Sequence, residues 1–220
     1  NWLDAAEKVR AYIACTYLLE ADDDEEISRL DETLQAAWDD LEHRRVDTAL
    51  LSSRQAFTGY SRMHTTLELR HTHRQSLQAQ AYSELLALRR QAGDAAVCPA
   101  VGLDGSELDI QINVVDWSNG AYENLLAEIN EHIAFFEEHN YQAGLAELQG
   151  YLAHTLPELS QALAEVLFKA RLAVLNSQVR INIADLALQA LKSQGFVVKE
   201  AGYAENDMQM DYYAAAEGSD

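Results

Sequence analysis

The residues with the clearest potential for chemistry are histidines and glutamates at helical spacing. Glu68 and His71 form a Glu-x-x-His motif, and Glu128 and His132 stand four residues apart, on one face of a predicted helix. A di-iron helical bundle uses two Glu-x-x-His motifs and two further glutamates, and this sequence holds only one such motif. We therefore keep a Glu/His metal site at these four residues as the alternative, and favour histidines that lie in helix seams. No cofactor is predicted.

Other catalytic or ligand-binding motifs are absent from the sequence. There is no glycine-rich phosphate loop, no Gly-x-Ser-x-Gly elbow and no Cys-x-x-Cys pair. Asp104, Glu107 and Asp109 lack the spacing of a calcium-binding EF-hand. Cys15 and Cys98 are too few for a disulfide framework. Because an active site can be assembled from residues far apart in sequence, an enzyme is not excluded, but a non-enzymatic protein is favoured.

A second polar group lies within a predicted helical seam and suggests binding to a protein. Tyr60, His64, Leu67, His71 and Arg74 share one helix face. Polar groups in an otherwise apolar seam set register or face a partner, so we predict an interaction surface here. The competing account is intramolecular, with the acids of residues 123–147 facing these side chains.

The charge of the chain excludes some partners. The formal net charge is −20, which argues against nucleic acid, because Lys and Arg supply most of that affinity by neutralising phosphates. Residues 96–156 contain no Lys or Arg at all, whereas Arg outnumbers acids in residues 51–95. The acidic run 22–26 suits the first turn of a helix, where carboxylates face the positive end of the dipole. We predict a protein partner or self-association.

Hydropathy and the chain ends bear on location. No apolar run approaches the roughly 20 residues that a membrane-spanning helix needs. No targeting segment is visible, so we predict a cytoplasmic protein with no membrane association. The sequence begins with Asn1 and Trp2 and lacks an initiator methionine. We therefore expect the chain to be a fragment of a longer protein.

The longest helical pattern of the second half spans residues 157–194 and is expected to organise the fold. Thr155 and Pro157 are typical of a helix start, and Gly195 is typical of a stop. The helix carries two apolar faces, from which we predict that it is covered on two sides. The first face, the seam, comprises Leu163, Leu167, Ala170, Val174, Ser177, Ile181, Ala184, Leu188 and Leu191. The other face, the second stripe, comprises Phe168, Leu172, Leu175, Val179, Ile183 and Leu186.

The rest of the chain is predicted as further helices and two hairpins. Residues 2–20, 118–140 and 141–154 are expected to be helical, and residues 24–90 form one long helix or two, because the apolar phase changes near 45–51. Alternating residues predict a β-hairpin over 96–114, and two more strands at 196–198 and 208–213. We expect three parts, 1–95, 96–195 and 196–220.

The fold class is therefore mainly α, a long-helix bundle or coiled-coil-like layer with a small β element of two hairpin-like units. The predicted function is a non-enzymatic helical scaffold or protein-interaction module that self-associates. The alternative is a helical metal-binding protein or enzyme with a Glu/His site.

Overall fold

The computed structural model describes residues 1–137, 143–204, 210 and 212–218. The chain forms two compact units, the first from residues 1–80 with 140–150 and the second from residues 81–139 with 151–220. One helix, α3 (Val46–Ala95), contributes to both units. The three ranges expected from the sequence, 1–95, 96–195 and 196–220, stay a prediction.

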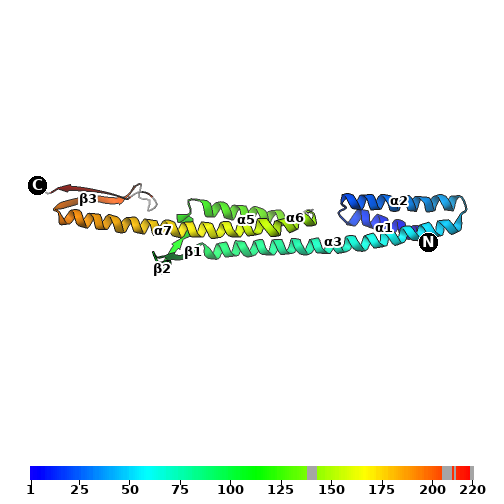
Figure 1. Cartoon of the computed structure of the whole chain (residues 1–220), viewed down its shortest axis with the longest axis horizontal. Helices are drawn as coiled ribbons and strands as arrows, with labels where there is room; N and C mark the ends of the chain where they lie inside the picture. The colour runs from blue at the N-terminus through cyan, green and yellow to red at the C-terminus, as the bar shows by residue number, and fades with distance from the viewer. Residues whose placement is uncertain (138–142, 205–209, 211, 219–220) are drawn as a thin grey trace. The chain divides into compact units, whose positions relative to one another are not determined.

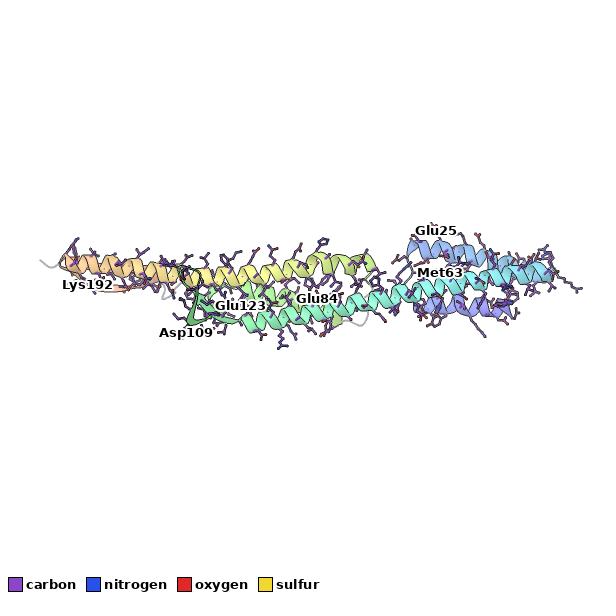
Figure 2. The ribbon with its side chains drawn as sticks, turned by 60° about the horizontal axis from the view of Figure 1, so that its bottom comes forward. Glu25, Met63, Glu84, Asp109, Glu123 and Lys192 are labelled. Carbon is purple, nitrogen blue, oxygen red and sulfur yellow. The ribbon has the colours of Figure 1, made fainter. Side chains whose placement is uncertain are left out.

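The first unit is a helical layer built on the N-terminal part of α3. Helices α1 (Trp2–Thr16) and α2 (Ala21–Glu42) lie beside it (Figure 1). Met63, labelled in Figure 2, marks the stretch of α3 that enters the shared core. The unit also contains α6 (Leu145–Gly150). The buried residues of this core are Leu3, Ala6, Ile13, Leu34, Ala37, Ala56, Tyr60, Met63 and Leu67.

The pattern over residues 24–90 corresponds to two helices, not one. Helix α2 ends at Glu42 and α3 begins at Val46. Arg44, between them, has a positive φ of 61°, a left-handed conformation that no α-helix continues through. The backbone N–H of Arg45 donates to the carbonyl of Asp40, which closes the turn at 2.8 Å. The change of apolar phase near 45–51 therefore marks a real break.

The second unit packs the C-terminal part of α3 with α4 (Val114–Trp117), α5 (Ala121–Glu137) and α7 (Leu156–Ser193). Helix α5 lies along α7 (Figure 1). The buried Tyr122 of α5 donates its hydroxyl to the carbonyl of Ala92 on α3, at 2.6 Å. The apolar core of this unit includes Ala81, Leu85, Leu88, Val114, Leu125, Ile129, Ile133, Phe136, Leu156, Leu159, Leu163, Ala170 and Val174.

Helix α7 starts where the sequence predicts, at Leu156 with Pro157 in its first turn, but without the expected cap. A short π-helical turn, Tyr151–Thr155, leads directly into α7, and Thr155 has helical backbone angles without a side-chain capping bond. The expected helix over 141–154 is thus represented by α6 and this turn, and residues 141–142 lie outside the described part. Helix α7 ends as predicted, because Gly195 takes a positive φ of 91°.

Both predicted hairpins are present. Strands β1 (Val97–Val101) and β2 (Glu107–Asn113) are antiparallel, and Gly105 in their turn has a φ of 79°. Strands β3 (Phe196–Tyr203) and β4 (Tyr212–Gly218) form the other hairpin. The final strand was expected at 208–213, where residues 208, 209 and 211 are not described. It runs instead through alanines that have little strand propensity and so gave no signal.

The predicted fold class is confirmed: long helices pack together beside two small antiparallel two-stranded sheets. In the part of the chain that the structure describes, no helix is both long and apolar enough to cross a membrane.

Candidate interaction surface

The predicted polar patch of α3 lies in the first unit, and two of its members are core residues. Tyr60 is fully buried and Leu67 is 2% exposed. The hydroxyl of Tyr60 donates to the carboxylate of Asp31 on α2, which also accepts two bonds from Arg10 on α1. Helices of this same chain therefore cover Tyr60 and Leu67. Binding of a partner by the patch as a whole stays a prediction.

The other three members of the patch, His64, His71 and Arg74, are half-buried and meet residues of the same unit. His64 Nε2 lies 3.2 Å from the hydroxyl of Tyr17, whose ring also packs edge-on against both histidines. Arg74 donates to Nδ1 of His71 at 3.1 Å. The contacts described for the two histidines come from aromatic and polar side chains nearer in the sequence. The competing account, in which acids of residues 123–147 face these groups, stays a prediction, since residues 138–142 of that range lie outside the described part.

An ion pair that was not predicted from the sequence joins α2 to α3. Asp23 is 7% exposed, and its Oδ2 accepts from Nη1 of Arg70 at 2.6 Å and from the backbone N–H of Glu20 at 2.9 Å. The Glu20 carboxylate lies 3.7 Å from the same guanidinium. The available signal was the capping box formed by Glu20 and Asp23 at the start of α2. The cluster therefore ties the start of α2 to α3.

A cavity beside this cluster is too small for a ligand. Its volume is about 20 Å³, which is room for roughly one water molecule. It is lined by Tyr17, Leu18, Glu20, Leu67, Arg70, His71, Arg74, Gly144 and Leu145.

The four residues of the alternative metal site are distributed over both units. Glu68 and His71 belong to the first unit, and Glu128 and His132 belong to the second. Among the described residues, no group of three or more His, Cys, Asp or Glu is placed to hold a metal ion. Nδ1 of His71 accepts from Arg74, and the ring of His132 packs edge-on against Tyr151 at 5.4 Å.

An exposed apolar feature of the second unit is the second stripe of α7. Phe168, Ile183 and Leu186 are 66%, 62% and 66% exposed, and Leu172 is 39% exposed. The prediction that α7 is covered on two sides is therefore wrong for this chain. The seam is mostly covered, with Leu163, Ala170, Val174, Ser177 and Leu188 buried and Leu167 and Ile181 half-buried.

The six residues of the second stripe form one continuous face. At about 100° per residue they fall within an arc of about 80° on the helix surface. Strands β3 and β4 pack on a different face of α7, where Ser177 lies 2.9 Å from the hydroxyl of Tyr203. Lys192, labelled near the end of α7 in Figure 2, lies well off the stripe by the same helical geometry. The stripe thus presents an uninterrupted apolar surface along the helix.

A groove between the first hairpin and α7 extends this surface. Its volume is about 520 Å³, and we call it the hairpin groove. Leu103, at the tip of the β1–β2 hairpin, is 79% exposed and lines it together with Phe168 and Leu172 of the second stripe. The remaining lining residues are Val101, Gly102, Gly105, Ala164, Leu167, Arg171 and Leu175.

The stretch of α7 that carries most of this surface has bases and no acids. Residues 166–184 contain Lys169, Arg171 and Arg180 and no acid, although the whole chain carries a formal charge of −20. Arg171, at the edge of the hairpin groove, has its Nη2 3.8 Å from Glu107 and its Nε 3.5 Å from the sulfur of Cys98. An approaching acidic protein therefore meets little like-charge repulsion along this stretch of α7.

The side chains of the second stripe were predicted from the sequence as an apolar face, but as one that other elements cover. The exposure of Leu103 was not predicted, because a leucine in a turn has no distinctive pattern. In comparisons with known proteins, no family model, no curated protein and no solved structure matches this chain.

Proposed function

We propose that this chain is a non-enzymatic helical scaffold or protein-interaction module that binds through the second stripe of α7. The observation that supports the proposal is the exposure of Phe168, Ile183 and Leu186 on one helical face. Contiguous exposed apolar surface of this kind marks interaction sites. A cytoplasmic location, expected from the sequence, stays a prediction.

The energetic argument concerns the water-exposed area of these side chains. Complete burial of a large apolar side chain contributes about 1.5–3 kcal/mol. Because each of these three is about two-thirds exposed, its burial by a partner would contribute about 1–2 kcal/mol. The free energy gained by burying the stripe is therefore enough to support binding, but it does not exceed the entropic cost of association by a wide margin.

The geometry suggests how a partner would bind. An amphipathic helix that docks in an apolar groove places anchors at spacings of three and four residues. The second stripe has that spacing, and the hairpin groove offers a slot for one bulky apolar side chain. We therefore expect helix-to-helix packing.

Site-specific photo-crosslinking in cells tests this function. A photoreactive phenylalanine analogue replaces Phe168 or, in a second variant, Leu186. The matched control carries it at Lys192, which is on the same helix but off the stripe. We expect protein adducts, identified by mass spectrometry, at the two stripe positions and not at Lys192, and we expect Ile183→Asp to abolish them. Equal adducts at all three positions, or none at any, would contradict the proposal.

A further inference from the structure

We propose that the occupant of the second stripe is a second copy of this chain, packed antiparallel across a two-fold axis. This inference rests on the proposed function, because it names the partner of the same surface. Three observations carry it: the symmetry of the stripe, the hairpin groove at one end of it, and its charges.

The second stripe has nearly the same spacing in both directions along α7. Two antiparallel copies with their axis near residue 177 would place Phe168 opposite Leu186, Leu172 opposite Ile183 and Leu175 opposite Val179. Each apolar residue then meets an apolar partner, as an isologous two-fold interface requires. The stripe spans about 27 Å, at about 1.5 Å per residue. A surface that complements itself in this way favours a second copy over an unrelated partner.

The hairpin groove fits the same arrangement. In the antiparallel register, Ile183 and Leu186 of one copy approach Phe168 and Leu172 of the other. These two residues line the groove together with Leu103. Two-fold symmetry supplies this contact twice, so both exposed ends of the stripe become covered. The apolar side chains of the stripe that are exposed in the single chain would then all be covered in the dimer.

The charge distribution favours the antiparallel orientation. Arg171 of one copy would lie opposite residues 182–185 of the other, a stretch that ends in Asp185. A parallel pair would instead keep Arg171 and Asp185 about 21 Å apart along the axis, at about 1.5 Å per residue. No carboxylate lies between residues 166 and 184, so Asp185 is the acid that the antiparallel register brings to the Arg171 end of the other copy.

The expected affinity follows from the size of the surface. Stable dimers bury about 800 Å² on each partner. One helical stripe and a hairpin tip form a smaller contact, so we expect dissociation in the micromolar range and not the nanomolar range. The equilibrium is therefore measurable at ordinary protein concentrations.

Sedimentation of the 220-residue chain, from about 5 to 300 μM, measures the dimer. We expect a monomer–dimer equilibrium that Ile183→Asp weakens by at least about tenfold, with the helical circular dichroism unchanged because Ile183 is exposed. Leu186→Asp serves as the second stripe variant. The matched control is Leu69→Asp, since Leu69 is 68% exposed on α3 in the first unit, and it should leave association unchanged. A control that disrupts the dimer as strongly as the stripe variants would overturn the proposal.

Crosslinking between two differently tagged copies tests the orientation. One copy carries Phe168→Cys and the other Leu186→Cys, each with Cys15→Ser because Cys15 is an exposed free thiol. A short bis-maleimide should join residue 168 to residue 186 and give no 168–168 product, because antiparallel packing separates those positions by about 27 Å. A 168–168 product overturns the antiparallel arrangement. A purified chain that stays monomeric while Phe168 captures a different protein in cells overturns the second copy but leaves the proposed function standing.

Discussion

The hydrogen-bonded group of Arg10, Asp31 and Tyr60 gives a prediction whose size depends on pH. The Asp31 carboxylate accepts from Nε and Nη2 of Arg10, at 2.5 and 2.7 Å, and from the hydroxyl of the fully buried Tyr60. These bonds, those of Arg10 foremost, hold the pKa of Asp31 below its usual range, and burial raises the pKa of Tyr60. Tyr60→Phe keeps the buried ring and removes only the donated bond.

A hydrogen bond to a charged group contributes about 1.5–3 kcal/mol to stability. Because the Asp31 side chain is 32% exposed and keeps Arg10, we expect Tyr60→Phe to cost about 1.5 kcal/mol near neutral pH. Asp31 has a lower pKa in the folded than in the unfolded chain. Its contribution is therefore complete above its unfolded pKa of about 3.9 and is lost as the pH falls through the folded value. The cost of Tyr60→Phe should shrink accordingly at about pH 2.5.

Urea unfolding followed by circular dichroism at both pH values measures this difference. Tyr82→Phe is the matched control, since Tyr82 also lies on α3 and donates to a carboxylate, that of Glu137 at 2.8 Å, but in an exposed pair. Tyr82→Phe should produce no measurable change in the free energy of unfolding. An equal cost of Tyr60→Phe at pH 7 and pH 2.5 would refute the reasoning, because it would show that packing and not the charged hydrogen bond is lost.

Three further predictions concern packing and binding. Gly93→Ala should stabilise the protein by about 0.4–1 kcal/mol, because the added methyl meets no atom within 4 Å. Gly59→Ala should not stabilise it, because its methyl would overlap Leu30. Denaturant melts that show equal gains in stability for the two variants would contradict this prediction. Leu85→Ala should lower the free energy of unfolding by about 2–5 kcal/mol, and Leu69→Ala should lower it by less than about 0.5 kcal/mol, since Leu85 is fully buried and Leu69 is exposed. A loss under about 1 kcal/mol for Leu85→Ala would show that Leu85 is not part of the core. Gel-shift titration at physiological salt should show no submicromolar binding to nucleic acid, given the charge of −20, and such binding would disprove the charge argument.

The helices and hairpins could largely be predicted because their signals are local. Gly195 ends α7 through a positive φ, as expected of a glycine there. The alternating residues before Asn113 form β2. The start of α7 at Thr155 and Pro157 was also predicted, because helix α7 begins at Leu156 with Pro157 in its first turn, but the expected capping bond from Thr155 is absent because a π-helical turn precedes it. Local signals therefore predict the type and position of an element more reliably than they predict the structure that precedes it.

The exposed surface could not be predicted, because exposure depends on the neighbours of an element. Val174 and Ile183 belong to two apolar faces of the same helix, and both faces have the spacing of a packed seam. Only Val174 is buried, since the elements that the chain supplies cover one face. Similarly, Tyr60 and Leu67 were expected at an interaction surface, but α1 and α2 cover them. The spacing of apolar residues identifies the apolar faces of a helix, but it does not show whether other elements of the chain cover them.

The burial of Asp23 has a consequence for how the acidic run 22–26 tolerates mutation. Five consecutive carboxylates look interchangeable in the sequence, yet Asp22, Asp24, Glu25 and Glu26 are exposed while Asp23 is buried and bonded to Arg70. Four of these positions are therefore open to neutral substitution by genetic drift or by design. The fifth is constrained by a residue 47 positions away. A homologue that has lost Asp23 would be expected to have replaced Arg70 as well, so these two positions should vary together wherever this fold occurs.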